Sequence, residues 1–235
     1  MNEFLKDYKY KIELHAHTKP ASRCGHIEPE EVVRMYKAAG FDAVVITNHF
    51  ADYNILDGKG SKEEKIEKYY NDFERAYNEG KKTGVKVILG MEIRFSENAN
   101  DYLVYGIDKE DLYRAYDFLD KEIKKFYNSF KNAGNLIIQA HPFRDNMERA
   151  DVNFIDGIEV FNMHPNHNSR VGLAAKFAKE NNLLKTGGTD FHQAEHLAMV
   201  ATVTKNLPKD SFELADIIKK QDFIFDISGN KILLG

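Results

Sequence analysis

The stretch YKIELHAHT (residues 10–18) decides between two possible folds for this 235-residue chain. Its first part predicts a strand over Tyr10–Leu14, and His15 and His17 follow the strand directly. In an open, doubly wound α/β sheet, a glycine-rich phosphate-binding loop usually follows the first strand. Because LHAHT stands at that position, the stretch favours a barrel, in which side chains at the C-terminal strand ends converge on one mouth.

Short apolar runs alternate with longer amphipathic stretches along the rest of the chain. This alternation predicts an α/β fold with a largely parallel sheet, forming a single domain over residues 1–235. The expected strands are Tyr10–Leu14, Ala43–Thr47, Lys86–Met91, Tyr102–Ile107, Asn135–Ala140, Gly157–Phe161, Leu184–Thr186 and Met199–Val203. The expected helices lie near Pro29–Ala39, Lys62–Glu79, Lys109–Lys131, Ser169–Asn181 and Ser211–Lys220.

Composition limits the classes of partner. With 43% hydrophobic and 30% charged residues, the chain can bury a core, so disorder is not expected. Its net charge of −4 lacks the basic stripe that holds a nucleic-acid backbone. The lone Cys24 excludes an intrachain disulfide, and no apolar run approaches the roughly 18 residues of a membrane span. These features favour a cytoplasmic protein without a membrane or nucleic-acid partner, and leave the oligomeric state open.

Potential metal ligands recur where predicted strands end. His49 closes AVVITNH, His141 closes LIIQAHP, and Asp190 and His192 close KTGGTDFH. Glu92 follows the apolar run VKVILG, where a buried carboxylate needs compensation by positive charge. Imidazole is the commonest protein metal ligand, so this repetition predicts a polynuclear metal site assembled from distant segments.

The motifs HAH, TNH, GME, AHP and GTDFH, in this order from His15 to His192, resemble the polymerase and histidinol phosphatase (PHP) family of phosphoesterases. The resemblance implies a distorted, TIM-like β/α barrel of about seven strands that holds two to three divalent ions of manganese, zinc or iron. It also implies three groups of ligands, which are His15, His17, Glu92 and Asp190; His26, His49 and His192; and Glu92, His141 and a histidine after GIEVFN.

Two of the implied positions have alternatives. In KPASRCGHIEPEE, His26 is preferred over Cys24, whose thiolate would select zinc-like ions. In FNMHPNHNSR, His167 is preferred over His164 as the ligand. His196 lies outside the pattern and is expected at the surface or behind the ligands. Asn48 stands where family members often have aspartate.

The expected activity is hydrolysis of a phosphate ester, most simply a small phosphomonoester, by a hydroxide that bridges metal ions in a trinuclear site. Arg94, Arg144 and Arg170 follow the ligand motifs, and each is expected to contact the phosphate or, as the alternative, to form a salt bridge at the rim of the site. His164, if it is not a ligand, could donate a proton to the leaving oxygen. The alternatives are a metal-dependent amidohydrolase and a non-catalytic metal-binding module.

Overall fold

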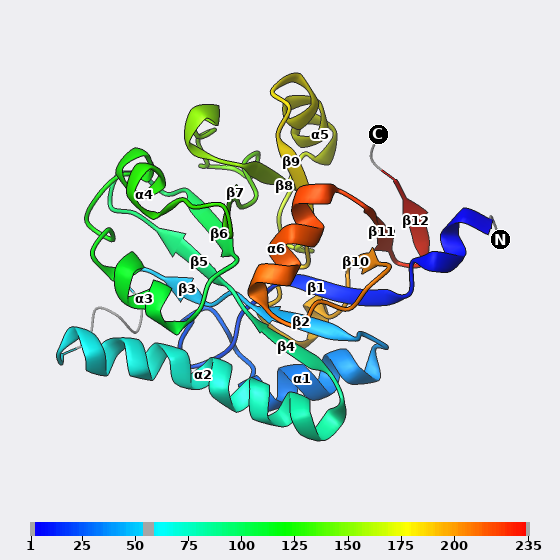
Figure 1. Cartoon of the computed structure of the whole chain (residues 1–235), viewed down its shortest axis with the longest axis horizontal. Coiled ribbons are helices and arrows are strands. Elements are labelled where there is room, and N and C mark those ends of the chain that lie inside the picture. Colours follow the sequence, from blue (N-terminus) through cyan, green and yellow to red (C-terminus); the bar gives the residue numbers. More distant parts are fainter. Residues whose placement is uncertain (1–2, 54–58, 234–235) are drawn as a thin grey trace.

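The computed structural model describes residues 3–53 and 59–233 and has an α/β fold with two mixed sheets (Figure 1). The first sheet has the strand order β12-β11-β10-β1-β2-β4. Its strands are β1 (Tyr10–Ala16), β2 (Ala43–Ile46), β4 (Lys86–Leu89), β10 (Ala201–Thr204), β11 (Phe223–Ile227) and β12 (Asn230–Ile232). The α/β class is therefore confirmed.

The second sheet has the order β3-β5-β6-β7-β8-β9. Its strands are β3 (His49–Phe50), β5 (Met91–Arg94), β6 (Asp101–Tyr105), β7 (Leu136–Gln139), β8 (Gly157–Asn162) and β9 (Leu184–Gly188). Strand β6 runs antiparallel to both β5 and β7, and β10, β11 and β12 are also antiparallel to their neighbours. The prediction of a largely parallel sheet was therefore too simple.

The two sheets are connected through shared chain segments. Strand β2 continues into β3 after two residues, and β4 continues into β5 across Gly90. A Cβ at Gly90 would approach the Thr47 side chain to 2.9 Å, so glycine permits this close crossing and divides the single strand expected over Lys86–Met91. A parallel bridge between Ala16 and Phe191 joins the end of β1 to the segment after β9. No continuous closed barrel is formed by the pairings within the described residues.

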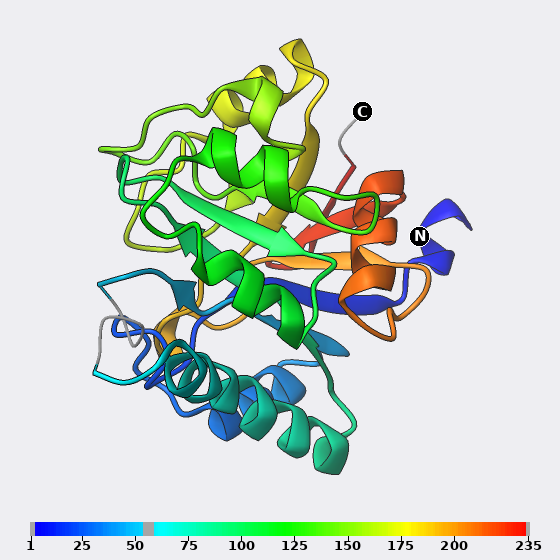
Figure 2. The ribbon, with the colours of Figure 1, turned by 60° about the vertical axis from the view of Figure 1, so that its left-hand side comes forward.

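In the described part of the chain, six α-helices cover the sheets, and Figures 1 and 2 show α1 and α2 together along one face. They are α1 (Pro29–Ala38), α2 (Lys62–Thr83), α3 (Lys109–Tyr116), α4 (Ile123–Phe130), α5 (Val171–Glu180) and α6 (Ser211–Lys220), with 3-10 turns at Glu3–Asp7, Val152–Phe154 and Ala194–His196. The sequence predicted one helix over Lys109–Lys131, but the structure has two, α3 and α4. They are separated by a turn that buries Leu119 in the core.

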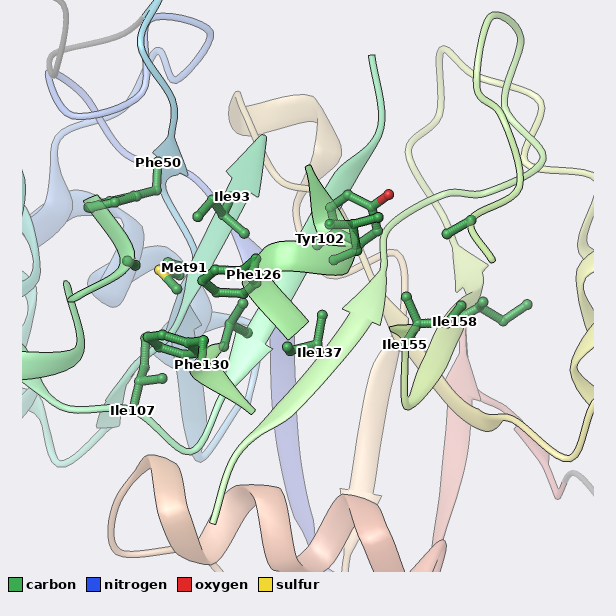
Figure 3. Close-up of a cluster of buried hydrophobic side chains, with 14 of the residues drawn as sticks. Phe50, Met91, Ile93, Tyr102, Ile107, Phe126, Phe130, Ile137, Ile155 and Ile158 are labelled. Carbon is green, nitrogen blue, oxygen red and sulfur yellow. The ribbon is translucent and has the colours of Figure 1, made fainter. Parts of the chain in front are cut away.

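The core has an inner and an outer part. The inner cluster joins Leu14 and Val45 of the first sheet to Leu103 and Ile138 of the second, and Leu214 of α6 packs against it. On the outside, Phe126 and Phe130 of α4 pack on β5, β6 and β7 (Figure 3). Burial of these apolar side chains fixes the strand ends relative to one another. None of the described helices is long and apolar enough to cross a membrane.

Candidate metal centre

Four imidazoles surround the buried carboxylate of Glu92. The Nε2 atoms of His15, His17 and His141 each lie 3.3 Å from a Glu92 oxygen, and His49 Nδ1 lies 2.8 Å away. In spite of these distances, neither Glu92 oxygen has a hydrogen-bond partner in the described part of the chain. A buried carboxylate that faces four imidazole nitrogens, and whose own oxygens have no hydrogen bond, is an arrangement that a cation would satisfy.

Strand geometry places these five side chains together. Parallel pairing of β3 with β5 in the second sheet sets His49 opposite Glu92. His15 and His17 lie at the end of β1 in the first sheet, and both lie 3.3 Å from Glu92. His141 follows β7 and has a backbone φ of 31°, a value that residues other than glycine rarely adopt. Backbone strain of this kind persists where the surrounding structure fixes a functional side chain.

Asp190 adds a second buried carboxylate to the centre. One of its oxygens lies 3.5 Å from His15 Nε2 and 3.4 Å from His17 Nε2, while His192 Nδ1 is 3.5 Å away. Asp190 also has a positive φ, of 57°. The predicted ligands His15, His17, His49, Glu92, His141, Asp190 and His192 thus lie in one cluster.

The structure brings Cys24, and not His26, into this cluster. Ligand atoms of Cys24, His17, His49 and His192 all lie within 4.8 Å of one another. His26 is exposed, and its backbone N–H donates to the carbonyl of His192. Burial would raise the pKa of the Cys24 thiol, but hydrogen bonds with His192 and His49 lower it to about 7. Cys24 is therefore able to supply a thiolate near neutral pH.

His164 and His167 also differ from the expectation. His164 is buried and forms a group with His192 and His196 whose nitrogens lie within 4.8 Å of one another. His167 is exposed and contacts Arg144. His196, expected at the surface or behind the ligands, is 3% exposed, and its Nε2 is a buried atom with no hydrogen-bond partner among the described residues.

Two acidic residues near the centre were not predicted. Asp101, the first residue of β6, forms a possible ligand group with His49 and Glu92 and lies 3.8 Å from His141 Nε2. Glu159 in β8 lies 3.0 Å from His15 Nδ1 and accepts a hydrogen bond from the backbone N–H of His141. Glu159 therefore orients His15, and leaves its Nε2 directed at Glu92.

Asn48 has a structural role in the TNH motif, at the position where PHP-family members often have aspartate. Its side-chain oxygen accepts hydrogen bonds from the backbone of Thr18 and from Ser22, and its nitrogen donates to Thr18. The Ser22 hydroxyl is in turn 3.1 Å from His17 Nδ1. Asn48 thus holds the segment that follows β1 without adding a charge.

The buried carboxylates and imidazoles of the centre shift the pKa values of one another. Burial opposes protonation of His15, but Glu159, Asp190 and Glu92 raise its pKa well above its usual value. Burial also opposes ionisation of Glu92, yet His49 and His15 hold its pKa well below its usual value. His17 differs, because burial and then His49 lower its pKa to about 4, which leaves it neutral and able to bind a metal at neutral pH.

The three arginines lie at different places. Arg144 contacts Asp190, at 3.4 Å, and His167, so it borders the centre. Arg94 donates from Nε and Nη2 to the two carboxylate oxygens of Asp101, and its guanidinium lies over the Tyr53 ring. Arg170 is held by Asp145 and by the backbone carbonyl of Phe143, and it lines a pocket together with His164 and His167.

Comparison with known proteins agrees with this centre. A family model described as the PHP domain matches residues 13–229, which is most of the chain. The chain belongs to the PHP domain family. The resemblance of the five sequence motifs to this family is thereby confirmed, and the candidate His, Glu and Asp ligands lie within the matched region. No curated protein matches this PHP chain.

Solved structures share its fold at low sequence identity. A two-domain protein from Bacteroides vulgatus, said to contain a predicted PHP-like metal-dependent phosphoesterase, has 18% identity and a TM-score of 0.64. The match covers 94% of the present chain and 65% of the Bacteroides vulgatus protein. A protein from Bifidobacterium adolescentis, described as a metal-dependent phosphoesterase by provisional assignment, has 14% identity and a TM-score of 0.52. The match covers 89% of the present chain and 96% of that protein. An amidohydrolase from Chromobacterium violaceum with bound sulfate has 16% identity and a TM-score of 0.53, and the match covers 77% of the present chain and 87% of that protein.

Proposed function

We propose that this PHP protein is a metal-dependent phosphoesterase that hydrolyses a small phosphomonoester. The observation that carries the proposal is the buried Glu92 carboxylate, which faces four imidazole nitrogens without a hydrogen bond. Family membership adds to it, because PHP-like neighbours are described as metal-dependent phosphoesterases. We also propose that the two sheets are parts of one distorted TIM-like barrel of seven strands, joined at the Ala16–Phe191 bridge.

The ligand atoms favour a trinuclear site. One ion would be held by His15, His17, Glu92 and Asp190, and a second by Cys24, His49 and His192. A third would be held by Glu92, Asp101 and His141, whose facing atoms are 3.3–3.8 Å apart. His164 and His196 lie next to His192 and could complete the second position. The mixture of thiolate, imidazole and carboxylate donors suits manganese, zinc or iron.

The ions, Arg144 and His164 would have different roles in the proposed phosphate-ester hydrolysis. Divalent ions in the centre would lower the pKa of bound water to about 7 and neutralise phosphate oxygens. Arg144, which borders Asp190, would bind the substrate phosphate through its guanidinium, whereas Arg94 and Arg170 are engaged by Asp101 and Asp145. Burial lowers the pKa of His164 to about 3, which favours its neutral form at neutral pH over the imidazolium that would act as a general acid.

A substrate panel in labelled water tests the activity. The protein loaded with manganese, zinc or iron should hydrolyse phosphomonoesters, and chelation should abolish the activity. In oxygen-18 water, a single turnover should place the label in the released phosphate. Cleavage of amide substrates in place of phosphate esters would support the amidohydrolase alternative, which the Chromobacterium violaceum neighbour favours. Metal binding without either activity would indicate a non-catalytic module.

The choice between Cys24 and His26 gives a separate prediction. Replacing Cys24 with serine should weaken zinc binding by at least about tenfold, because the thiolate is the softest ligand in the cluster. Replacing the exposed His26 with alanine should leave zinc affinity unchanged. In the unmodified protein, zinc should slow alkylation of Cys24, the one cysteine of the sequence. Zinc affinity that depends on His26 and not on Cys24 would contradict this assignment.

A further inference from the structure

A cavity of about 540 Å³ lies between α2, β4 and α6, in the volume range of small-molecule sites. Figure 1 shows β4 passing between these two helices. The lining includes β4 as far as Leu89, which lies three residues before Glu92, or roughly 10 Å along the extended chain. None of the lining residues is a metal-ligand candidate, so the cavity is distinct from the metal centre.

Aromatic side chains form much of the cavity wall. Tyr70, Phe73 and Tyr77 follow one another at helical spacing along α2, and Phe212 comes from the first turn of α6. Tyr77 is 37% exposed and Phe212 is 40% exposed, so both belong to the few large apolar side chains that remain accessible to water. A planar ligand in this cavity would cover both rings and gain stacking free energy.

Lysines supply positive charge in the same cavity. Lys81, Lys86, Lys109 and Lys209 all line it. Lys86 is half-buried, and no ion-pair partner lies within 4.0 Å of it in residues 3–53 and 59–233. Lys81 lies over the Tyr77 ring with its ammonium 4.3 Å from the centroid. Lys86 interacts electrostatically with Glu213 without a close ion pair, and an anionic ligand would give it a counter-charge at contact distance.

Three acidic residues also belong to the lining, Glu74, Asp108 and Asp210. Asp108 accepts a hydrogen bond from the backbone of Asp111 and caps α3, and Asp210 caps α6 by accepting from the backbone of Phe212 and Glu213. Lys109 and Lys209 form ion pairs with Glu67 and Glu213, outside the lining. Lys81 and Lys86 are therefore the lining lysines that an anion can approach without displacing a close ion pair of the described chain.

We propose that this cavity binds a nucleotide, with the planar base against Tyr77 and Phe212 and the phosphates at Lys81 and Lys86. Both parts of the ligand are needed to match the wall, since aromatic rings alone would accept any apolar molecule and lysines alone any anion. The proposal does not depend on phosphoesterase activity, because the cavity shares no residue with the metal centre.

Calorimetry on chelator-treated protein tests the proposal, since removal of ions keeps a nucleoside triphosphate from binding at the metal centre. ATP, GTP, CTP and UTP are titrated separately, and at least one should bind saturably with one molecule per chain. The matching nucleoside and inorganic triphosphate should each bind at least about tenfold more weakly. Absence of saturable binding by all four nucleotides would overturn the proposal.

Variants locate the binding. F212A and K86E should each weaken nucleotide binding by at least about tenfold, because they remove a stacking ring and reverse a charge. K68E changes an exposed lysine of α2 outside the cavity and should leave the affinity unchanged. H17A, in the metal centre, should also bind the nucleotide as before. Circular dichroism shows whether each variant is folded. Unchanged affinity in both folded cavity variants, or loss of binding in folded H17A, would refute the assignment.

Discussion

Replacing Glu92 with glutamine should reduce phosphatase activity by at least about a thousandfold, because the carboxylate contributes to two of the proposed metal positions. Both of its oxygens face imidazole nitrogens, so the loss of its negative charge affects every ion beside it. Glutamine keeps nearly the same shape and should preserve packing around β5. The expected defect is therefore in metal affinity, with the fold maintained.

Thermal unfolding and calorimetry measure this effect. For the unmodified protein, an ion at about 100 times its dissociation constant should add about 2.7 kcal/mol to the free energy of unfolding. E92Q should lose most of this stabilisation. E195Q makes the same chemical change at an exposed residue near the centre and should behave like the unmodified protein. If E92Q kept its metal affinity and activity, Glu92 could not be the bridging ligand that we propose.

The sequence pattern was sufficient to bring together candidate ligands at the ends of parallel strands. His49 and Glu92 are examples, since each directly follows or lies within a short apolar run and their strands pair in parallel. Asp101 was missed because β6 is antiparallel to its neighbours, so its first residue, and not its last, lies beside the centre. A search limited to strand ends cannot find such a residue without knowledge of strand direction.

Ligand candidates in loops were harder to assign. The choice of Cys24 over His26, and the approach of His196 to His192, depend on how the chain turns after β1 and β9. Periodicity contains no information on these turns, because it reports only which face of a regular element is buried. The hairpin of β11 and β12, by contrast, had a readable signal in the apolar run FIFDI followed by Ser228-Gly229.

A substitution outside the ligand set should also disable the centre. Gly188 ends β9 directly against His15, and a Cβ at this position would lie 2.4 Å from His15 Cβ and 2.9 Å from Glu159 Oε1. Because the closest atom belongs to the stem of a buried side chain, His15 or the β9 backbone must move. G188A should lower the free energy of unfolding by about 1–3 kcal/mol, the usual cost of overpacking.

The displacement of His15 should add a metal-binding defect of about 10–100-fold in affinity, as expected when the support of a ligand is altered. Denaturant unfolding of the metal-free protein measures the packing cost, and calorimetry at a temperature where the variant is folded measures the affinity. G172A is the matched control, since a Cβ in that part of α5 meets no atom within 4 Å and should stabilise the helix by at most about 1 kcal/mol. Normal stability together with normal metal affinity in G188A would mean that His15 is free to shift, and that the contact between β9 and β1 does not position this ligand.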